Sequence, residues 1–129
     1  MPLVRIDLVE GRPSEQVRLI ADTVQEVMLA VFAAPARDRY QIVTEHPAGR
    51  IIAEDTGLGF ERTEGVTVIQ IFQQGRSEQQ KRAAYSELAS RLEERCGIAP
   101  TDLIVSMVSN NREDWSFGLG RAQFLEGDL

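Results

Sequence analysis

The second residue of the chain, Pro2, could do chemistry that an internal proline cannot. Methionine aminopeptidases usually remove an initiator methionine that precedes a small residue such as proline, which would leave Pro2 with a free secondary amine. Such an amine can act as a base when neutral, as a hydrogen-bond donor when protonated, or as a nucleophile toward a carbonyl. A Met-Pro start is also common in proteins where it reflects only processing, so other residues must supply the case for catalysis.

Arg76 is a second residue whose setting could support chemistry. It lies next to Ser77, where the sequence predicts the start of a helix, so its charge opposes the positive end of the helix dipole. Backbone N–H groups at a helix start favour an anion, and a guanidinium can bind a carboxylate through two hydrogen bonds. Arg76 is therefore either a solvated surface charge or part of a carboxylate-binding site.

Asp38 is a candidate partner of the Pro2 amine, in the short connection that follows the first predicted helix. It is either a solvated loop charge or a neighbour of the Pro2 amine. A nearby carboxylate favours the protonated form of an amine. In the second case Pro2 would act at neutral pH as an acid or as a hydrogen-bond donor, and not as a base.

The apolar pattern predicts the elements that must position these residues. Runs of alternating or continuous apolar residues indicate strands, and apolar residues at helical spacing indicate helices. Strands are expected at 3–8, 40–45, 66–72 and 103–108, and helices from Ser14 to about Ala34 and from Ser77 to about Cys96. The run VTVIQIF at 66–72 is nearly apolar on both faces, which predicts a central strand.

Local signals define the ends of both helices. Ser14 is expected to cap the first helix, and Ser77 with Gln80 fits a capping box for the second. Gly97 is expected to end the second helix. The buried stripe of that helix is predicted to consist of Tyr85, Leu88, Ala89, Leu92 and Cys96.

The chain contains an internal repeat. LVRIDLVEGRPSEQ at 3–16 resembles VTVIQIFQQGRSEQ at 66–79, and each predicted helix is followed by an apolar strand. We therefore expect an α+β fold of two layers, in which two β-α-β units share one sheet with two helices on one face. One domain over 1–129 is expected, with repeats of about 2–64 and 65–129. The other face of the sheet would need a cover, which suggests oligomerisation.

The composition excludes several classes of protein. The 129 residues carry a net charge of −6, whereas nucleic-acid binders and polybasic membrane anchors need a basic face. No apolar run is long enough for a membrane span, and no signal peptide is visible. Cys96 is the only cysteine and His46 the only histidine, which makes a poor metal site. We expect a cytoplasmic protein without a metal or cofactor.

The aromatic tail could contribute a wall to a site. Trp115 and Phe117 belong to DWSFGLG, whose glycines predict a hairpin or cap and not a helix. Such aromatic residues usually belong to a core or an interface, and a cap could also line a pocket. Tyr40 could donate a hydrogen bond to a site, but burial against the sheet is the simpler expectation for it. His46 is expected to be structural.

Taken together, these residues resemble the tautomerase superfamily. The features are the Met-Pro start, the two β-α-β units and Gly75-Arg76-Ser77 before the second helix. Three further stretches, ARDRYQ at 36–41, EDTGLGF at 54–60 and DWSFG at 114–118, resemble its malonate semialdehyde decarboxylase branch. The resemblance covers essentially the whole chain. It implies the tautomerase fold and a homotrimer with an amino-terminal proline in a pocket near each subunit boundary.

The resemblance also implies roles for individual residues. Pro2 matches the catalytic proline, Asp38 the aspartate that sets its protonation, and Arg76 an arginine that binds the substrate carboxylate. Some members place a second arginine where this chain has Gln74, which can donate a hydrogen bond but carries no charge. The apolar pocket wall is matched by Trp115, Phe117 and Phe124, with Leu129 a weaker match.

Three functions follow from these observations. The first is decarboxylation of malonate semialdehyde or a related β-oxo acid, without a cofactor, with Pro2 as a hydrogen-bond donor or as a Schiff-base amine. The second is keto–enol tautomerisation or hydration of 2-oxo acids in the same pocket. The third is a non-catalytic trimeric binding protein, which any fold can become. In the two catalytic cases the partner is a small oxo acid.

Overall fold

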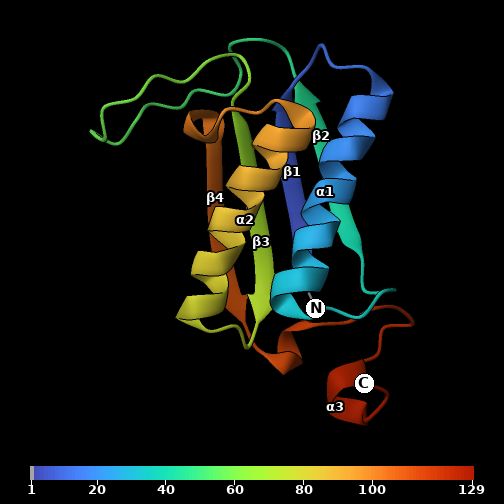
Figure 1. The fold of residues 1–129 in the computed structure, drawn as a ribbon. Coiled ribbons are helices and arrows are strands. Elements are labelled where there is room, and N and C mark those ends of the chain that lie inside the picture. The colour runs from blue at the N-terminus through green and yellow to red at the C-terminus, as the bar shows by residue number, and fades with distance from the viewer. Residues whose placement is uncertain (1) are drawn as a thin grey trace.

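A computed structural model of the chain describes residues 2–129 and consists of two layers (Figure 1). One layer is a four-stranded sheet, and the other is a pair of helices that covers one face of it. The elements in chain order are β1 (Leu3–Val9), α1 (Ser14–Phe32), β2 (Tyr40–His46), β3 (Thr67–Gln74), α2 (Glu78–Cys96), β4 (Leu103–Asn110) and α3 (Gln123–Glu126). None of the helices within this part of the chain has an apolar stretch long enough to cross a bilayer.

The order of the strands is β2-β1-β3-β4, and the predicted pair of β-α-β units is confirmed. Within each unit the two strands run parallel, and the units join through antiparallel β1 and β3 at the centre. Leu3 pairs with Tyr40 on one side and with Phe72 on the other. The starts of β1 and β2 therefore lie at the same end of the sheet as the ends of β3 and β4.

The core lies between the sheet and the two long helices. Alternate residues of the central strands, such as Ile6 and Ile69, are fully buried under α1 and α2. Burying each such side chain contributes about 1.5–3 kcal/mol. The opposite face of the sheet is not covered by the described chain, and it carries exposed apolar side chains such as Ile42 (44% exposed) and Val108 (42%).

The helix caps agree with the sequence in two places and differ in one. Ser77 and Gln80 form the predicted capping box, and Gly97 ends α2 with φ of 67°. The prediction for Ser14 was wrong, because Ser14 is already the first helical residue and Pro13 occupies the cap position without a side-chain bond. The Pro13 carbonyl accepts the first helical hydrogen bonds, and this backbone role needs no capping side chain.

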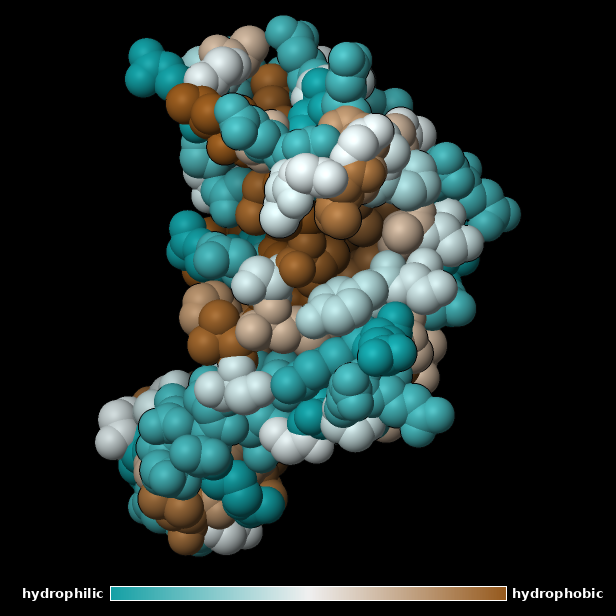
Figure 2. Space-filling view, turned by 90° about the vertical axis from the view of Figure 1, so that its left-hand side faces the viewer, coloured by the Kyte–Doolittle hydropathy of each residue, from teal (hydrophilic) through white to brown (hydrophobic). Residues whose placement is uncertain are grey.

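The predicted buried stripe of α2 was partly wrong. Leu88 and Leu92 are fully buried, but Ala84 joins them in place of Tyr85, which is 39% exposed. Ala84, Leu88 and Leu92 follow one another at intervals of four, so they share the helix face that meets the sheet. Tyr85 lines a shallow groove where α2 meets the edge strand β4. Figure 2 views the molecule from this side and shows apolar surface gathered in a hollow at mid-height.

Asp102 anchors the long connection between β2 and β3. Its buried carboxylate accepts hydrogen bonds from the Thr63 N–H, at 2.7 Å, and from the Thr63 hydroxyl. A Cβ atom placed on Gly65 would lie 3.0 Å from the same carboxylate, so a side chain there would crowd it. This anchor lies at the end of the sheet from which the connection projects, opposite to the C-terminal tail (Figure 1).

Candidate functional site

One end of the sheet brings together three of the residues singled out from the sequence. Pro2 is buried directly before β1, Asp38 shortly before β2, and Arg76 shortly after β3. The register that pairs Leu3 with both neighbouring strands places these three segments side by side. Asp38 is only 5% exposed, so the alternative of a solvated loop charge does not hold for it.

Asp38 and Arg76 interact electrostatically. Burial raises the pKa of the Asp38 carboxyl above its ordinary value, while the positive charge of Arg76 acts in the opposite direction. Desolvation is the larger of these two effects, because a buried carboxylate loses its hydration shell. The structure therefore brings together a buried acid and a cation that local sequence patterns indicate only as separate candidates.

Arg76 is held in place but keeps free donors. Its Nη1 donates to the Gln74 carbonyl at 2.7 Å, and its guanidinium lies 5.3 Å from the Phe32 ring centroid at the end of α1. Its Nε is shielded from solvent, and no hydrogen-bond acceptor reaches it from residues 2–129. A guanidinium has five donors, so this arrangement leaves several for a carboxylate ligand.

Gln74 takes part in the site through its backbone carbonyl. Its neighbour Gln73 is fully buried under the helices, so the Gln74 side chain is directed to the opposite face of the sheet. Gln74 pairs with Asn110 of β4 at the end of the sheet. The Gln74 side chain is not among those lining the cavities described below.

A cavity of about 410 Å³ opens beside Asp38. A second cavity of about 350 Å³ adjoins it and shares Tyr40 and Phe117 with it. Pro2 and Arg76 are not among the described residues that line either cavity. Of Pro2, Asp38 and Arg76, Asp38 is therefore the residue that borders the first cavity. The residues lining the first cavity are Pro35, Arg37, Asp38, Tyr40, Phe117, Gln123, Asp128 and Leu129.

The C-terminal tail supplies an aromatic wall to these cavities. Phe117 is its centre, with ring centroids 5.5 Å from Tyr40, 5.4 Å from Trp115 and 5.4 Å from Phe124. The Trp115 ring is stacked on Phe117, whereas Phe124 meets it edge-on. Leu129 lines the cavity that contains Asp38. The four apolar residues named from the sequence therefore gather at one end of the molecule.

Two residues of this region were missed or misplaced by sequence reasoning. Tyr40 was expected to be buried, but it is 38% exposed and lines both cavities. Its position shortly after Asp38 at the start of a strand was the signal that could have indicated it. Gln123 lines the first cavity and bonds to the backbone of the wall, and no local pattern in the sequence distinguishes it.

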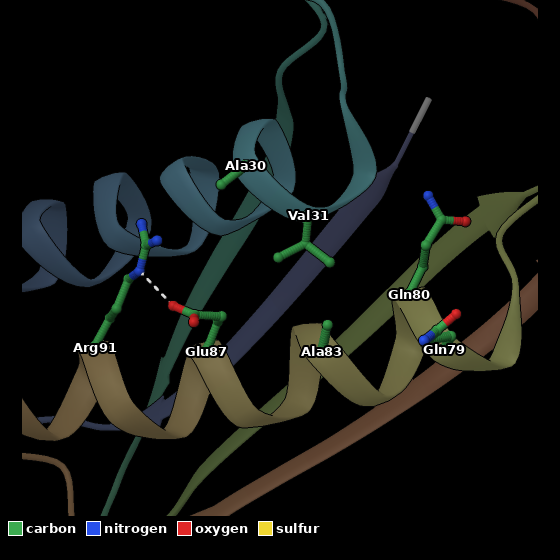
Figure 3. Close-up of a pocket in the computed structure, with 7 residues that line it drawn as sticks. All are labelled: Ala30, Val31, Gln79, Gln80, Ala83, Glu87 and Arg91. Atoms are coloured by element: carbon green, nitrogen blue, oxygen red, sulfur yellow. Dashed lines mark hydrogen bonds and ion pairs between the residues drawn. The ribbon is translucent and has the colours of Figure 1, made fainter.

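A larger groove between α1 and α2, of about 430 Å³, offers less chemistry (Figure 3). Its charged side chains, Glu87 and Arg91, bind each other at 2.9 Å, and Val31 faces Ala83 between the helices. The Gln80 amide is already used in the cap of α2. We therefore place the candidate site at the cavity that contains Asp38.

Other titratable groups lie apart from this cavity. His46 contacts Asp7 at 2.7 Å near the far end of β1, in keeping with a structural role. Within the part of the chain that the structure describes, no three His, Cys, Asp or Glu side chains gather closely enough to hold a metal ion.

The pKa of Asp38 predicts a pH-dependent change in stability. Because the folded chain has the higher pKa, it holds this proton over a pH range in which the unfolded chain has lost it. Stability therefore falls as pH rises through that range, and the loss is complete above the folded pKa. Asp38→Asn, which mimics the protonated form, is expected to be more stable than the wild type at pH 7. The difference should shrink as pH falls toward about 3.9, the usual pKa of an aspartate.

Urea unfolding of both proteins between pH 3 and pH 8 would measure this difference. Asp22→Asn is the matched control of opposite sign, because a hydrogen bond from Arg39 lowers the pKa of Asp22. That variant is expected to lose a little stability at pH 7. An Asp38→Asn protein less stable than the wild type at pH 7 would show that the ionised carboxylate is net stabilising.

Comparison with known proteins agrees with this geometry. Two family models, each described as "Tautomerase enzyme", match residues 38–118 and 2–61. "Probable tautomerase YrdN" of Bacillus subtilis (strain 168) is 52% identical over 129 residues, which cover 100% of both chains. "Probable tautomerase YusQ" of the same organism is 32% identical and aligns over 98% of this chain and 100% of its own. A structure of malonate semialdehyde decarboxylase is 45% identical, covers 98% of each chain and has a TM-score of 0.94. The chain therefore belongs to the tautomerase superfamily, on the branch that resembles malonate semialdehyde decarboxylase.

Proposed function

We propose that this chain removes CO₂ from malonate semialdehyde or a closely related β-oxo acid, with the Pro2 amine as its catalytic group once Met1 is removed. The observation that carries the proposal is the meeting of Pro2, Asp38 and Arg76 at one end of the sheet. It is supported by 45% identity to a malonate semialdehyde decarboxylase over 98% of the chain.

In this proposal Arg76 binds the substrate carboxylate. Its guanidinium is fixed by the Gln74 carbonyl and the Phe32 ring, and its remaining N–H groups can form two parallel bonds to a carboxylate. Binding at a fixed guanidinium can hold the breaking C–C bond perpendicular to the plane of the aldehyde carbonyl. In that orientation the electrons of the bond pass directly into the carbonyl π system.

Pro2 stabilises the charge that develops when CO₂ leaves. Cleavage of the bond between the carboxylate and the methylene carbon places an electron pair on the aldehyde as an enolate. A protonated Pro2 can donate a hydrogen bond to the enolate oxygen, and a Schiff base of Pro2 would take up the pair as an enamine. Protonation of the methylene carbon of the enolate gives acetaldehyde directly. Protonation of the enamine gives an iminium, and the water released when the Schiff base formed is taken up again to free acetaldehyde and Pro2. By either route one substrate anion and one proton yield acetaldehyde and CO₂.

Asp38 and the aromatic wall have complementary roles. An ionised Asp38 next to the amine favours the ammonium form of Pro2, which is the form needed for hydrogen bonding. Phe117 and Leu129 present an apolar surface to the same cavity. Such a surface favours neutral CO₂ over a carboxylate, since charge is poorly solvated there.

We further propose that the chain assembles as a homotrimer, as its resemblance to the family implies. The sheet face opposite the helices is not covered by residues 2–129, and it exposes Ile42 and Val108. Packing this face against two further copies would remove apolar surface from water. Sedimentation equilibrium at micromolar concentration tests this assembly, and a stable monomer would contradict it.

The direct test is CO₂ release from malonate semialdehyde by the purified protein. Intact mass must first confirm that Met1 is absent, because a retained methionine would convert the amine into an amide. We expect turnover on the order of 10 s⁻¹, the median for enzymes. A preparation with one additional residue before Pro2 is the control, and it should be inactive. No release above background by the Met-free protein would contradict the proposal.

Tautomerisation or hydration of a 2-oxo acid is the second candidate. It is favoured by the names of the two curated relatives, both of which are described as probable tautomerases. A proline that abstracts a proton must be neutral, whereas Asp38 favours the protonated form. Assays of both reactions on the same preparation would decide between them.

A further inference from the structure

The Gln123 side chain spans the turn that carries the aromatic wall. Its Oε1 accepts a hydrogen bond from the Phe117 N–H at 2.9 Å, and its Nε2 donates to the Gly118 carbonyl at 2.8 Å. A backbone N–H can only donate and a carbonyl can only accept, so both contacts fix the same orientation of the amide. One side chain thus binds the backbone of two consecutive residues, Phe117 and Gly118, beside the cavity.

The turn that Gln123 closes has a backbone shape that needs support from other parts of the chain. Gly118, Leu119 and Gly120 all have positive φ, at 138°, 62° and 65°. Positive φ is unfavourable for a residue with a side chain such as leucine, and glycines are flexible in the absence of other constraints. The Gly118 carbonyl also accepts from the Arg121 N–H at 3.3 Å. The amide of Gln123 therefore supplies two of the bonds that define the turn.

Phe117 is the residue whose position this clamp controls. Its ring contacts Tyr40, Trp115 and Phe124, and it lines the same cavity as Asp38 and Gln123. A displacement of the Phe117 backbone would therefore move the centre of the wall. Side-chain displacements of about 1 Å near a reacting group can cost up to 10²-fold in rate.

We propose that Gln123 is a positioning residue, which holds Phe117 against the cavity so that the apolar wall faces the leaving CO₂. Its effect on turnover rests on the proposed decarboxylase function, whereas its effect on the wall does not. Because Arg76 and not the wall binds the carboxylate, loss of the clamp should lower kcat and leave KM nearly unchanged.

Two variants separate the two arms of the clamp. Gln123→Glu keeps an oxygen that can accept from Phe117 but places a carboxylate oxygen against the Gly118 carbonyl, so it breaks one arm. Gln123→Ala breaks both arms. We expect kcat to fall about tenfold in Gln123→Ala and by less in Gln123→Glu, with KM within twofold of the wild type. Gln79→Ala is the matched control, since Gln79 is an exposed residue in the groove between the helices (Figure 3).

Trp115 provides a readout that does not depend on activity. It is the only tryptophan of the chain, and its ring is stacked on Phe117 at 5.4 Å. Acrylamide quenching of its fluorescence should increase in the order wild type, Gln123→Glu, Gln123→Ala, while the midpoint of urea unfolding stays close to that of the wild type. Gln79→Ala should match the wild type in every measurement.

Each outcome decides the matter. Unchanged quenching and unchanged kcat in Gln123→Ala would overturn the inference, as would a rise in KM without a fall in kcat. If Gln123→Ala does not fold, Gln123→Glu alone carries the test with the same criteria. If the wild type proves inactive on malonate semialdehyde while quenching still follows the expected order, the positioning of the wall is supported and the decarboxylase function is not.

Discussion

Pro2→Ala is expected to lower turnover of malonate semialdehyde by about 10²- to 10⁴-fold, the range typical for loss of a positioned acid–base group. Alanine after Met1 is also exposed by methionine removal, so a free amine remains, but it is a primary amine without the ring. The ring fixes the directions of the N–H bonds, whereas the protons of a primary ammonium rotate freely. A Schiff base of a secondary amine is also permanently cationic, whereas that of a primary amine can lose its charge.

The rate of CO₂ release, measured on protein of verified mass, gives this effect. Pro13→Ala is the matched control, because Pro13 is an exposed proline at the start of α1 and makes no side-chain cap bond. That variant should retain activity within twofold. Near-normal turnover by the Pro2→Ala protein would defeat the proposed mechanism, whatever the substrate.

The second large effect is expected at Arg76. Arg76→Gln should lower kcat/KM by about 10²- to 10⁴-fold, mainly through a higher KM, because a charged hydrogen bond is worth about 1.5–3 kcal/mol and two would be lost. Arg76→Lys should recover part of this loss, since lysine keeps the charge but not the paired donors.

Arg76 also affects the ionisation of Asp38. Because its charge lowers the pKa of the Asp38 carboxyl, removing that charge should raise this pKa further. The acidic limb of the kcat/KM profile should therefore move to higher pH in Arg76→Gln. Arg82→Gln is the control, because Arg82 is exposed on α2 and pairs with Glu78 in the preceding turn. An unchanged KM in Arg76→Gln would show that the carboxylate binds elsewhere.

The sequence predicted the architecture well because its local signals agreed with one another. The repeated strand, Gly-Arg and Ser-Glu-Gln pattern defined two β-α-β units, and the capping box at Ser77 fixed the start of α2 nearly to the residue. The apolar run at 66–72 indicated the central strand, which the structure places next to β1. Each of these signals is formed by residues close together in the sequence, so each can be recognised without knowing the fold.

The differences arise where distant parts of the chain decide the outcome. The exposure of Tyr40 depends on its strand being at the edge of the sheet and on its side chain facing the uncovered side. Tyr85 was assigned to the buried stripe because its spacing fits a helix, but it lies over the edge strand. The clamp made by Gln123 depends on the fold of the tail, which has no periodic pattern. The meeting of Asp38 with Arg76 could be expected only through the family resemblance.

The antiparallel contact of β1 with β3 means that the two similar β-α-β units begin at opposite ends of the sheet. By the repeat, Gly65 corresponds to Pro2 and Arg12 to Arg76, and Asp102 directly precedes β4 as Asp38 shortly precedes β2. At the far end, however, the strand begins inside the chain, and its nitrogen belongs to a peptide bond that cannot serve as a base or a nucleophile. There the aspartate binds Thr63 and ties down a loop. A fold of two similar units in one chain therefore has only one end where a free amino terminus can stand, and here the other end serves as a structural joint.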